Sequence, residues 1–156
     1  MITRRSLVSW LWTALGLAAV VELIWIVASF LRPRRRPVAE GSDVVIAGPV
    51  ERFEPGGVTP FPEGKFYLVR LDSGGFLAIY RECTHLGCTV PWDAAQRRFS
   101  CPCHASAFDI TGAVLAPPAP RPLDLLPVRI ENGVVKVDTA ARIQRLSFDQ
   151  TQAVSP

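Results

Sequence analysis

Residues 83–88 read Cys83-Thr84-His85-Leu86-Gly87-Cys88, and residues 101–106 read Cys101-Pro102-Cys103-His104-Ala105-Ser106. These two boxes contain all 4 cysteines and both histidines of the 156-residue chain. Thiolates and imidazoles are common ligands of transition metals in proteins. Because they occur here only in two tight clusters, a metal site is the first hypothesis. Zinc bound by the same boxes, or two structural disulfides with uninvolved histidines, are the alternatives.

The spacing of the possible ligands is Cys-x-His in the first box and Cys-x-x-His in the second. This pattern resembles the motifs C-x-H-x-G-C and C-x-C-H-x-S of Rieske iron–sulfur proteins. In that family two cysteines bind one iron of a 2Fe–2S cluster and two histidines bind the other. The resemblance implies one such cluster, with Cys83 and Cys101 as thiolate ligands and His85 and His104 as imidazole ligands.

The two remaining cysteines, Cys88 and Cys103, match a disulfide that joins the cluster loops in the high-potential branch of the family. That branch comprises the iron–sulfur subunits of cytochrome bc and bf complexes and the small subunit of arsenite oxidase. A disulfide also indicates a compartment outside the cytoplasm. Gly87 fits a tight turn close to the cluster. The resemblance places Leu86 near the histidines, at the quinone pocket, and ordinary loop packing is its alternative role.

Three further features match the surroundings of a Rieske cluster. Ser106 matches a hydroxyl donor to a bridging sulfide. Phe108 stands where relatives have a tyrosine that donates to a ligand thiolate, so one hydrogen bond worth about 1 kcal/mol is missing. We therefore expect the redox potential of the cluster to be lower than in relatives that have the tyrosine, which suits a low-potential quinol such as menaquinol. Residues 116–120, which include Pro117 and Pro118, resemble the proline loop that covers the cluster, and prolines stiffen such a loop.

An apolar run covers residues 7–31. About 25 residues at 1.5 Å per residue are long enough to cross a bilayer, and too long for the apolar core of a signal peptide. We therefore expect an uncleaved transmembrane anchor. Its single charged residue, Glu22, is expected to face a partner helix or to be protonated, because a carboxylate in lipid is costly.

The arginines around this run give conflicting signals for its orientation. Two precede it and four follow it between residues 32 and 36, and the positive-inside rule alone would leave the head in the cytoplasm. Residues 3–7, Thr-Arg-Arg-Ser-Leu, resemble a twin-arginine export signal. We therefore expect residues 1–6 in the cytoplasm of a bacterium and the head on the periplasmic side of its cytoplasmic membrane. Residues 32–43 form the expected linker, which is stiffened by prolines.

After the linker, short strand-like runs alternate with turn signals, and no long amphipathic helix is visible. The expected strands, rich in β-branched and aromatic residues, are 44–46, 65–71, 75–80, 128–130 and 134–137. Asn132-Gly133 marks a tight hairpin. We predict an all-β fold, an antiparallel β-sandwich over residues 44–138 into which a cluster-binding subdomain, residues 83–115, is inserted. Residues 139–156 form the C-terminal tail, which either contains a short contact element at residues 142–146 or is loose.

The resemblance implies an electron-transfer subunit of a membrane quinol-oxidising complex, and residues 90–99 look closer to the chloroplast and cyanobacterial bf type than to the mitochondrial type. The partners implied are a cytochrome b-type subunit and a c-type cytochrome or copper protein as acceptor. His85 or His104 would take a proton as the cluster takes one electron, and the subunit alone would not oxidise quinol. The alternative is a relay subunit of a periplasmic molybdenum enzyme such as arsenite oxidase.

Two other classes of function are disfavoured. An oxygenase component would need further histidine and carboxylate ligands, and no spare histidine exists. The net charge of +3 includes no basic stripe that would indicate nucleic-acid binding.

Overall fold

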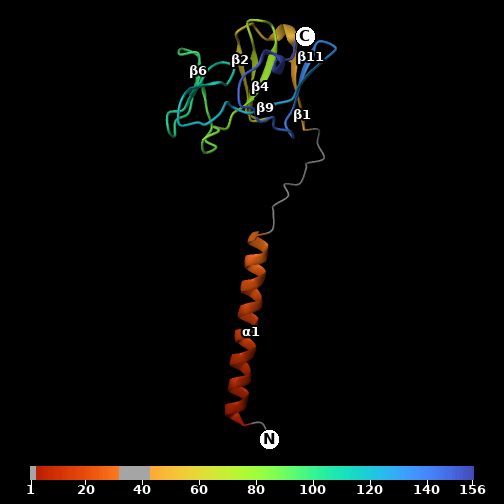
Figure 1. Cartoon of the computed structure of the whole chain (residues 1–156). Coiled ribbons are helices and arrows are strands. Elements are labelled where there is room, and N and C mark those ends of the chain that lie inside the picture. The colour runs from red at the N-terminus through yellow and green to blue at the C-terminus, as the bar shows by residue number, and fades with distance from the viewer. Residues whose placement is uncertain (1–2, 32–42) are drawn as a thin grey trace. The chain divides into compact units, whose positions relative to one another are not determined.

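The computed structural model describes residues 3–31 and 43–156 (Figure 1). The expected linker, residues 32–43, lies outside the described residues except for Asp43. The chain divides into two compact units, Met1–Val38 and Ala39–Pro156. The second unit is called the head below.

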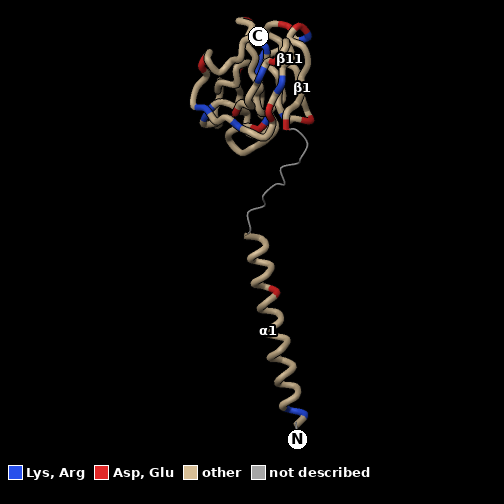
Figure 2. The backbone as a smooth tube through the Cα atoms, turned by 90° about the vertical axis from the view of Figure 1, so that its right-hand side faces the viewer, with Lys and Arg blue, Asp and Glu red and all other residues tan. Residues whose placement is uncertain are grey.

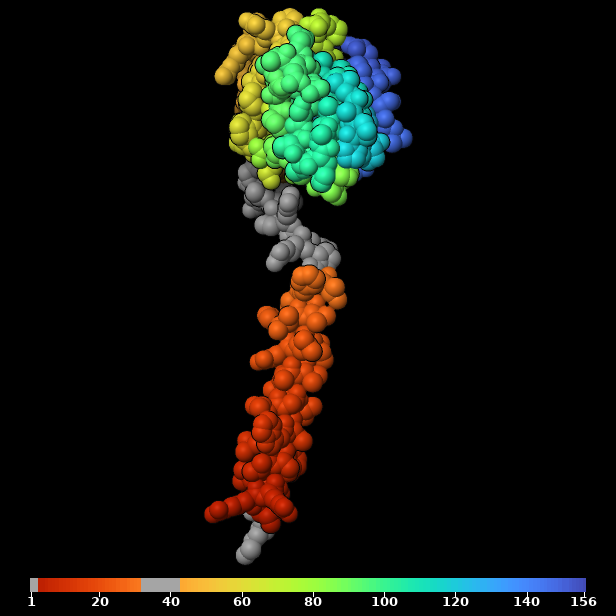
Figure 3. Space-filling view, turned by 90° about the vertical axis from the view of Figure 1, so that its left-hand side faces the viewer, coloured from red at the N-terminus to blue at the C-terminus, as the bar shows by residue number. Residues whose placement is uncertain are grey.

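The first unit contains the helix α1, Arg4–Leu31, of 28 residues. It begins after Thr3, whose Oγ1 accepts a hydrogen bond from the Ser6 amide at 3.4 Å, and this satisfies one of the free amides of the first turn. The helix is long and apolar enough to cross a membrane. None of its side chains is buried, as Figure 3 shows for one face, and charged residues are sparse along it (Figure 2).

The head contains three antiparallel sheets. The first sheet has the order β1-β11-β10, with bounds Val44–Pro49, Val134–Asp138 and Val128–Glu131. The second has the order β2-β3-β4-β9, with bounds Val58–Phe61, Phe66–Arg70, Phe76–Tyr80 and Leu125–Leu126. The third has the order β5-β6-β7-β8, with bounds Trp92–Asp93, Arg98–Ser100, Ala107–Phe108 and Val114–Ala116. Two short 3-10 helices are η1, Val50–Arg52, and η2, Gln150–Gln152.

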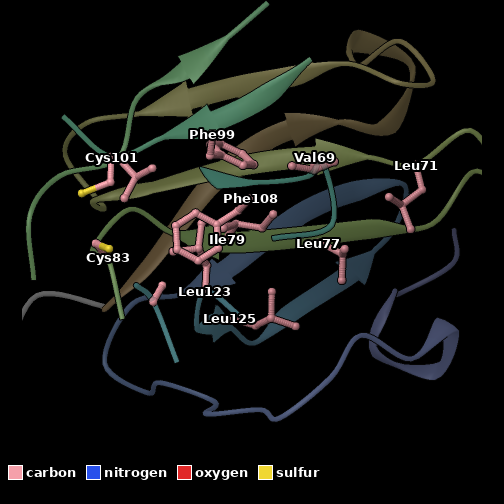
Figure 4. Packing of buried hydrophobic residues seen from close by; sticks show 12 residues of the cluster. Val69, Leu71, Leu77, Ile79, Cys83, Phe99, Cys101, Phe108, Leu123 and Leu125 are labelled. Carbon is pink, nitrogen blue, oxygen red and sulfur yellow. The ribbon is translucent and has the colours of Figure 1, made fainter. Parts of the chain in front are cut away.

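Strand β4 separates two hydrophobic cores because both of its faces are apolar. Side chains alternate across a strand, so Phe76, Ala78 and Tyr80 pack in a core with the first sheet. Leu77 and Ile79 point the other way, into a core shared with the third sheet (Figure 4). Every residue of β4 is buried. The second sheet is therefore the middle layer of the head.

The third sheet is inserted in sequence between β4 and β9, two strands that pair with each other. Its residues gather on one face of the head (green to cyan in Figure 3). The predicted fold class is confirmed: an all-β sandwich with an inserted subdomain, preceded by one N-terminal apolar helix. The tight hairpin also lies where Asn132-Gly133 predicted it, between β10 and β11, with φ angles of 52° and 73°.

The C-terminal segment, residues 139–156, is a contact element rather than a loose tail. Val154 pairs with Phe76 of β4, and the Phe76 amide donates to the Val154 carbonyl at 2.8 Å. Ile143 pairs with Leu125 of β9, and the two residues exchange hydrogen bonds of 2.8 and 3.0 Å. The segment therefore extends the second sheet at both places.

Candidate metal centre

The first box is a tight loop that follows β4. The Cys83 amide donates to the Cys88 carbonyl at 2.8 Å, and the Gly87 amide donates to the Cys83 carbonyl at 2.8 Å. Gly87 has a φ of 78°, a conformation that side chains with a Cβ rarely adopt. The turn expected at Gly87 is therefore present, and it brings both cysteines of the box close to the same end of β4.

The second box connects β6 to β7 in the third sheet and closes in a similar way. The Cys101 amide donates to the Ser106 carbonyl at 2.8 Å, and the Ala105 amide donates to the Cys101 carbonyl at 3.1 Å. Ala105 has a φ of 60°, which is uncommon for a residue other than glycine. This turn leaves His104 exposed while Cys101 and Ser106 are buried.

The two boxes are joined by a disulfide between Cys88 and Cys103, whose Cα atoms are 6.6 Å apart. Cys83 and Cys101 are free thiols, each only 4% exposed. The sulfur atoms of Cys88, Cys101 and Cys103 lie within 4.8 Å of one another, but two of these sulfurs are bonded together. Cys101 is therefore the member of that group that keeps a free thiol.

The two imidazoles come from different boxes and meet each other. The ring centroids of His85 and His104 are 4.9 Å apart and their planes are inclined by 89°. His85 is half-buried and His104 is exposed. Each box thus supplies one buried thiol and one imidazole closer to the surface. Leu86 lies on the first box with 70% of its surface exposed.

Burial raises the pKa of the Cys83 thiol. The backbone of His85 and the hydroxyl of Ser106 lower this pKa by hydrogen bonding, whereas the neighbouring Cys101 raises it. Thiolates are the form of cysteine that binds metals, and a bound cation deprotonates the thiol. The site is therefore one in which a metal centre would supply the positive charge that two buried thiolates need.

The proline loop, residues 116–120, is attached to the second box. The Ala119 amide donates to the buried Ser106 Oγ at 3.1 Å. Just beyond the loop, the Arg121 carbonyl accepts a hydrogen bond from Thr84 Oγ1 of the first box at 2.6 Å. The chain around the loop thus contacts both boxes. Pro117 and Pro118, joined by a cis peptide bond, are exposed.

Phe108 is fully buried in β7, within the same hydrophobic core as Cys83 and Cys101. Figure 4 shows the two cysteines at one end of this core and Phe108 near Ile79 and Leu123. The side chain has no polar atom to donate. The structure thus brings together the two free thiols, Ser106, the facing imidazoles and the disulfide.

Two attachments were missed by sequence reasoning, those made by Thr84 and by the Ala119 amide. A threonine inside the first box was a visible signal, but its acceptor is 37 residues away. The donor at position 119 belongs to the backbone, which the residue type does not reveal.

The donor set fits a Rieske cluster, because two free buried thiols and two imidazoles are what its two irons require. The same four donors would also fit tetrahedral zinc. Comparison with known proteins separates these two possibilities.

Residues 36–132 match the Rieske [2Fe-2S] domain family. Among curated relatives, the chloroplast cytochrome b6-f complex iron-sulfur subunit of Bigelowiella natans is 50% identical over 72 residues, which are 44% of this chain and 29% of that protein. The cyanelle cytochrome b6-f complex iron-sulfur subunit 1 of Cyanophora paradoxa is 40% identical over 103 residues, 62% of this chain and 43% of that protein. The chain thus spans less than half the length of these relatives.

Among solved structures, the plasma membrane Rieske protein PetC3 of Synechocystis PCC 6803 is 33% identical, with a TM-score of 0.49. The match covers 60% of this chain and 97% of that one. The family match itself spans more than half of the sequence and contains both boxes, the disulfide and the proline loop. On that ground the chain belongs to the Rieske [2Fe-2S] domain family.

Proposed function

We propose that this chain is the membrane-anchored iron–sulfur subunit of a quinol-oxidising complex of the cytochrome bc or b6f type. The observation that carries the proposal is the pairing of two buried free thiols with two facing imidazoles, on loops joined by a disulfide. The similarity to cytochrome b6-f iron-sulfur subunits supports it, and so does an N-terminal helix of membrane-spanning length.

In this proposal Cys83 and Cys101 would hold one iron of the 2Fe–2S cluster, and His85 and His104 would hold the other. When bound, the 2Fe–2S cluster supplies a one-electron acceptor. Its ligands divide according to burial, since the thiols are enclosed and the imidazoles lie nearer the surface. A partner can therefore reach the histidine side of the site, while the core keeps water from the thiolate side.

The histidines also handle the proton of the reaction. A ring nitrogen of His104 or His85 that is not bound to metal accepts a hydrogen bond from the quinol hydroxyl and then takes its proton. Imidazole is suited to this because small changes in its surroundings move its pKa across neutrality. Leu86 follows His85 in the first box and is exposed, and it contacts the quinone pocket of the partner subunit.

The proposed assembly is supported by the apolar helix, the disulfide and the similarity to cytochrome b6-f iron-sulfur subunits. Helix α1 crosses the bacterial cytoplasmic membrane with its N-terminus inside, and the head lies on the periplasmic side, where the disulfide of Cys88 and Cys103 is stable. A cytochrome b-type subunit completes the quinol site. The electron passes to a c-type cytochrome or a copper protein. The absence of a hydroxyl at Phe108 favours a low-potential quinol such as menaquinol.

The test is an EPR-monitored redox titration of native membranes, with and without an inhibitor of the quinol-oxidation site. A Rieske-type signal whose shape responds to the inhibitor is expected, because one histidine would lie against the quinone pocket. A Rieske-type signal whose shape is the same with and without the inhibitor would contradict the proposal. It would favour the relay subunit of a molybdenum enzyme. Digestion of the head by protease added to spheroplasts tests the orientation, and a protected head would contradict it.

A further inference from the structure

A buried arginine lies in the C-terminal segment, beyond the residues that match the family. Arg145 is 6% exposed, and among the described residues only Ser106 and Asp124 are other buried polar or charged side chains. Burying a charge is unfavourable unless the charge is paired and hydrogen-bonded. The contacts of the Arg145 guanidinium must therefore offset the loss of its hydration.

All three guanidinium nitrogens donate hydrogen bonds. Nε donates to the Leu123 carbonyl at 2.9 Å and Nη1 donates to Gln152 Oε1 at 2.9 Å. Nη2 donates to the Thr111 carbonyl. Two of the three acceptors are therefore backbone carbonyls that come from different segments of the head.

The surroundings accommodate the guanidinium in both shape and charge. A Cβ added to Gly112 would lie 2.7 Å from Arg145 Nη2, so a larger residue there would collide with it. Burial lowers the pKa of Arg145 to about 10, and the carboxylates of Asp109 and Asp124 oppose this shift. The side chain thus remains charged at neutral pH, close to two acidic groups.

The two carbonyls flank the proline loop on either side. Thr111 belongs to the turn between β7 and β8, and this turn leads from the second box into the loop. Leu123 follows the loop, and its amide donates to the Gly112 carbonyl at 2.9 Å. Between these two points, the Ala119 amide donates to Ser106 Oγ. One guanidinium thus joins the chain entering the loop to the chain leaving it.

We propose that Arg145 is a positioning residue that fastens both ends of the proline loop and so keeps the Ala119 amide on the Ser106 hydroxyl. The inference rests on the proposed function only in assuming that the two boxes hold the cluster. A hydroxyl that accepts a hydrogen bond becomes a stronger donor, because hydrogen bonds in a chain polarise one another. Loosening the loop would therefore weaken Ser106 as a donor towards the cluster.

The experiment compares three variants of the full chain in detergent. Arg145→Met removes all three hydrogen bonds and keeps a similar volume. Arg145→Lys keeps the charge but lacks the fork that serves two carbonyls from separate nitrogens. Gln152→Ala is the control, because it removes the Arg145 contact to the C-terminal 3-10 helix, together with the Gln152 hydrogen bond to the Ser147 carbonyl, and leaves both carbonyl contacts of Arg145.

The first measurement is amide hydrogen exchange of residues 116–123 in the chain without its cluster. Four of these residues are prolines, so the peptide reports on Ala116, Ala119, Arg121 and Leu123. We expect exchange at least about tenfold faster in Arg145→Met, as for the loss of a charge-assisted hydrogen bond. The exchange rate of Arg145→Lys should lie between those of the wild type and Arg145→Met, and the rate of Gln152→Ala should equal that of the wild type.

The second measurement is the midpoint potential of the loaded chain at pH 7, which should fall in Arg145→Met and stay unchanged in Gln152→Ala. Faster exchange confined to residues 139–156, with an unchanged potential, would overturn the proposal and leave Arg145 as an anchor of the C-terminal segment alone. If Arg145→Met does not fold, Arg145→Lys is used in its place. Exchange of residues 116–123 and a midpoint potential equal to those of the wild type in Arg145→Lys would then overturn the proposal. A wild-type chain without a Rieske-type signal would instead refute the proposed function, while the exchange data still test the fastening.

Discussion

Replacing Phe108 with tyrosine would place a hydroxyl group inside the core that surrounds the two free thiols. Phe108 is 0% exposed and shares a hydrophobic core with Cys83 and Cys101. The resemblance to Rieske proteins implies that a tyrosine hydroxyl at this position donates to a ligand thiolate. A donor stabilises the reduced cluster, because reduction adds negative charge. The potential of Phe108→Tyr should therefore be higher than that of the wild type.

The size of the shift follows from one hydrogen bond. A net contribution of about 1 kcal/mol corresponds to about 40 mV for a one-electron couple, at about 59 mV per tenfold change in equilibrium constant. The assay is an EPR-monitored redox titration of the full chain in detergent. A shift below about 10 mV would refute the reasoning, since the new hydroxyl would then not reach the cluster.

Phe99→Tyr is the matched control. Phe99 is also 0% exposed and lies in the same core. Its ring packs on Trp92 and Tyr67, with centroid distances of 4.7 and 5.2 Å. We expect this variant to lose stability, because a buried hydroxyl without a partner costs about 1–3 kcal/mol, and to keep the wild-type potential. Equal shifts of the redox potential in Phe108→Tyr and Phe99→Tyr would show that any hydroxyl added to this core changes the potential, whether or not it donates to a thiolate.

Three further predictions concern what holds the site together. Replacing Cys88 and Cys103 together with serine removes a link across 15 residues and should lower the free energy of unfolding by about 3 kcal/mol; denaturant titration measures this, and reductant should then destabilise the wild type but not the variant. Ser106→Ala leaves the buried Ala119 amide without its acceptor, which should cost about 1–3 kcal/mol and speed exchange of that amide, whereas Ser100→Ala, whose hydroxyl has no partner, should not. Hydrogen bonds from Thr151 lower the pKa of Asp149. The stabilisation of η2 by the ionised Asp149 is therefore complete above about pH 4 and is lost as the pH falls through the lowered folded-state pKa. The NMR chemical shift of the Thr151 amide should change over this pH range in the wild type and should not change in Asp149→Asn.

The strands that the sequence predicted are those with strong apolar character. The run 75–80 was readable because β4 is buried on both faces, and it differs from the observed strand, Phe76–Tyr80, by one residue. Strand β2, Val58–Phe61, was missed. It contains Pro60 and lies at the edge of its sheet, where a missing backbone donor is tolerated but the sequence signal is weak.

The site was predictable to the extent that its chemistry is carried by residue types. Cysteine and histidine are rare in this chain and fall into two boxes, so their spacing indicated a metal centre. The role of Arg145 could not be read in this way. It stands in a polar stretch without periodicity, and the carbonyls that accept its hydrogen bonds are more than 20 residues away in the sequence.

The insertion of the third sheet between β4 and β9 has a consequence for the order of assembly. Ala78 pairs with Leu126 and Ile79 pairs with Leu125, so the inserted stretch leaves the second sheet and returns to it at adjacent points. The first and second sheets therefore have strand neighbours that include no strand of the third sheet, and we expect them to form without the metal. We therefore expect iron to be delivered to a chain in which these two sheets are already folded, and we expect insertions in the cluster loops to alter the site without changing them.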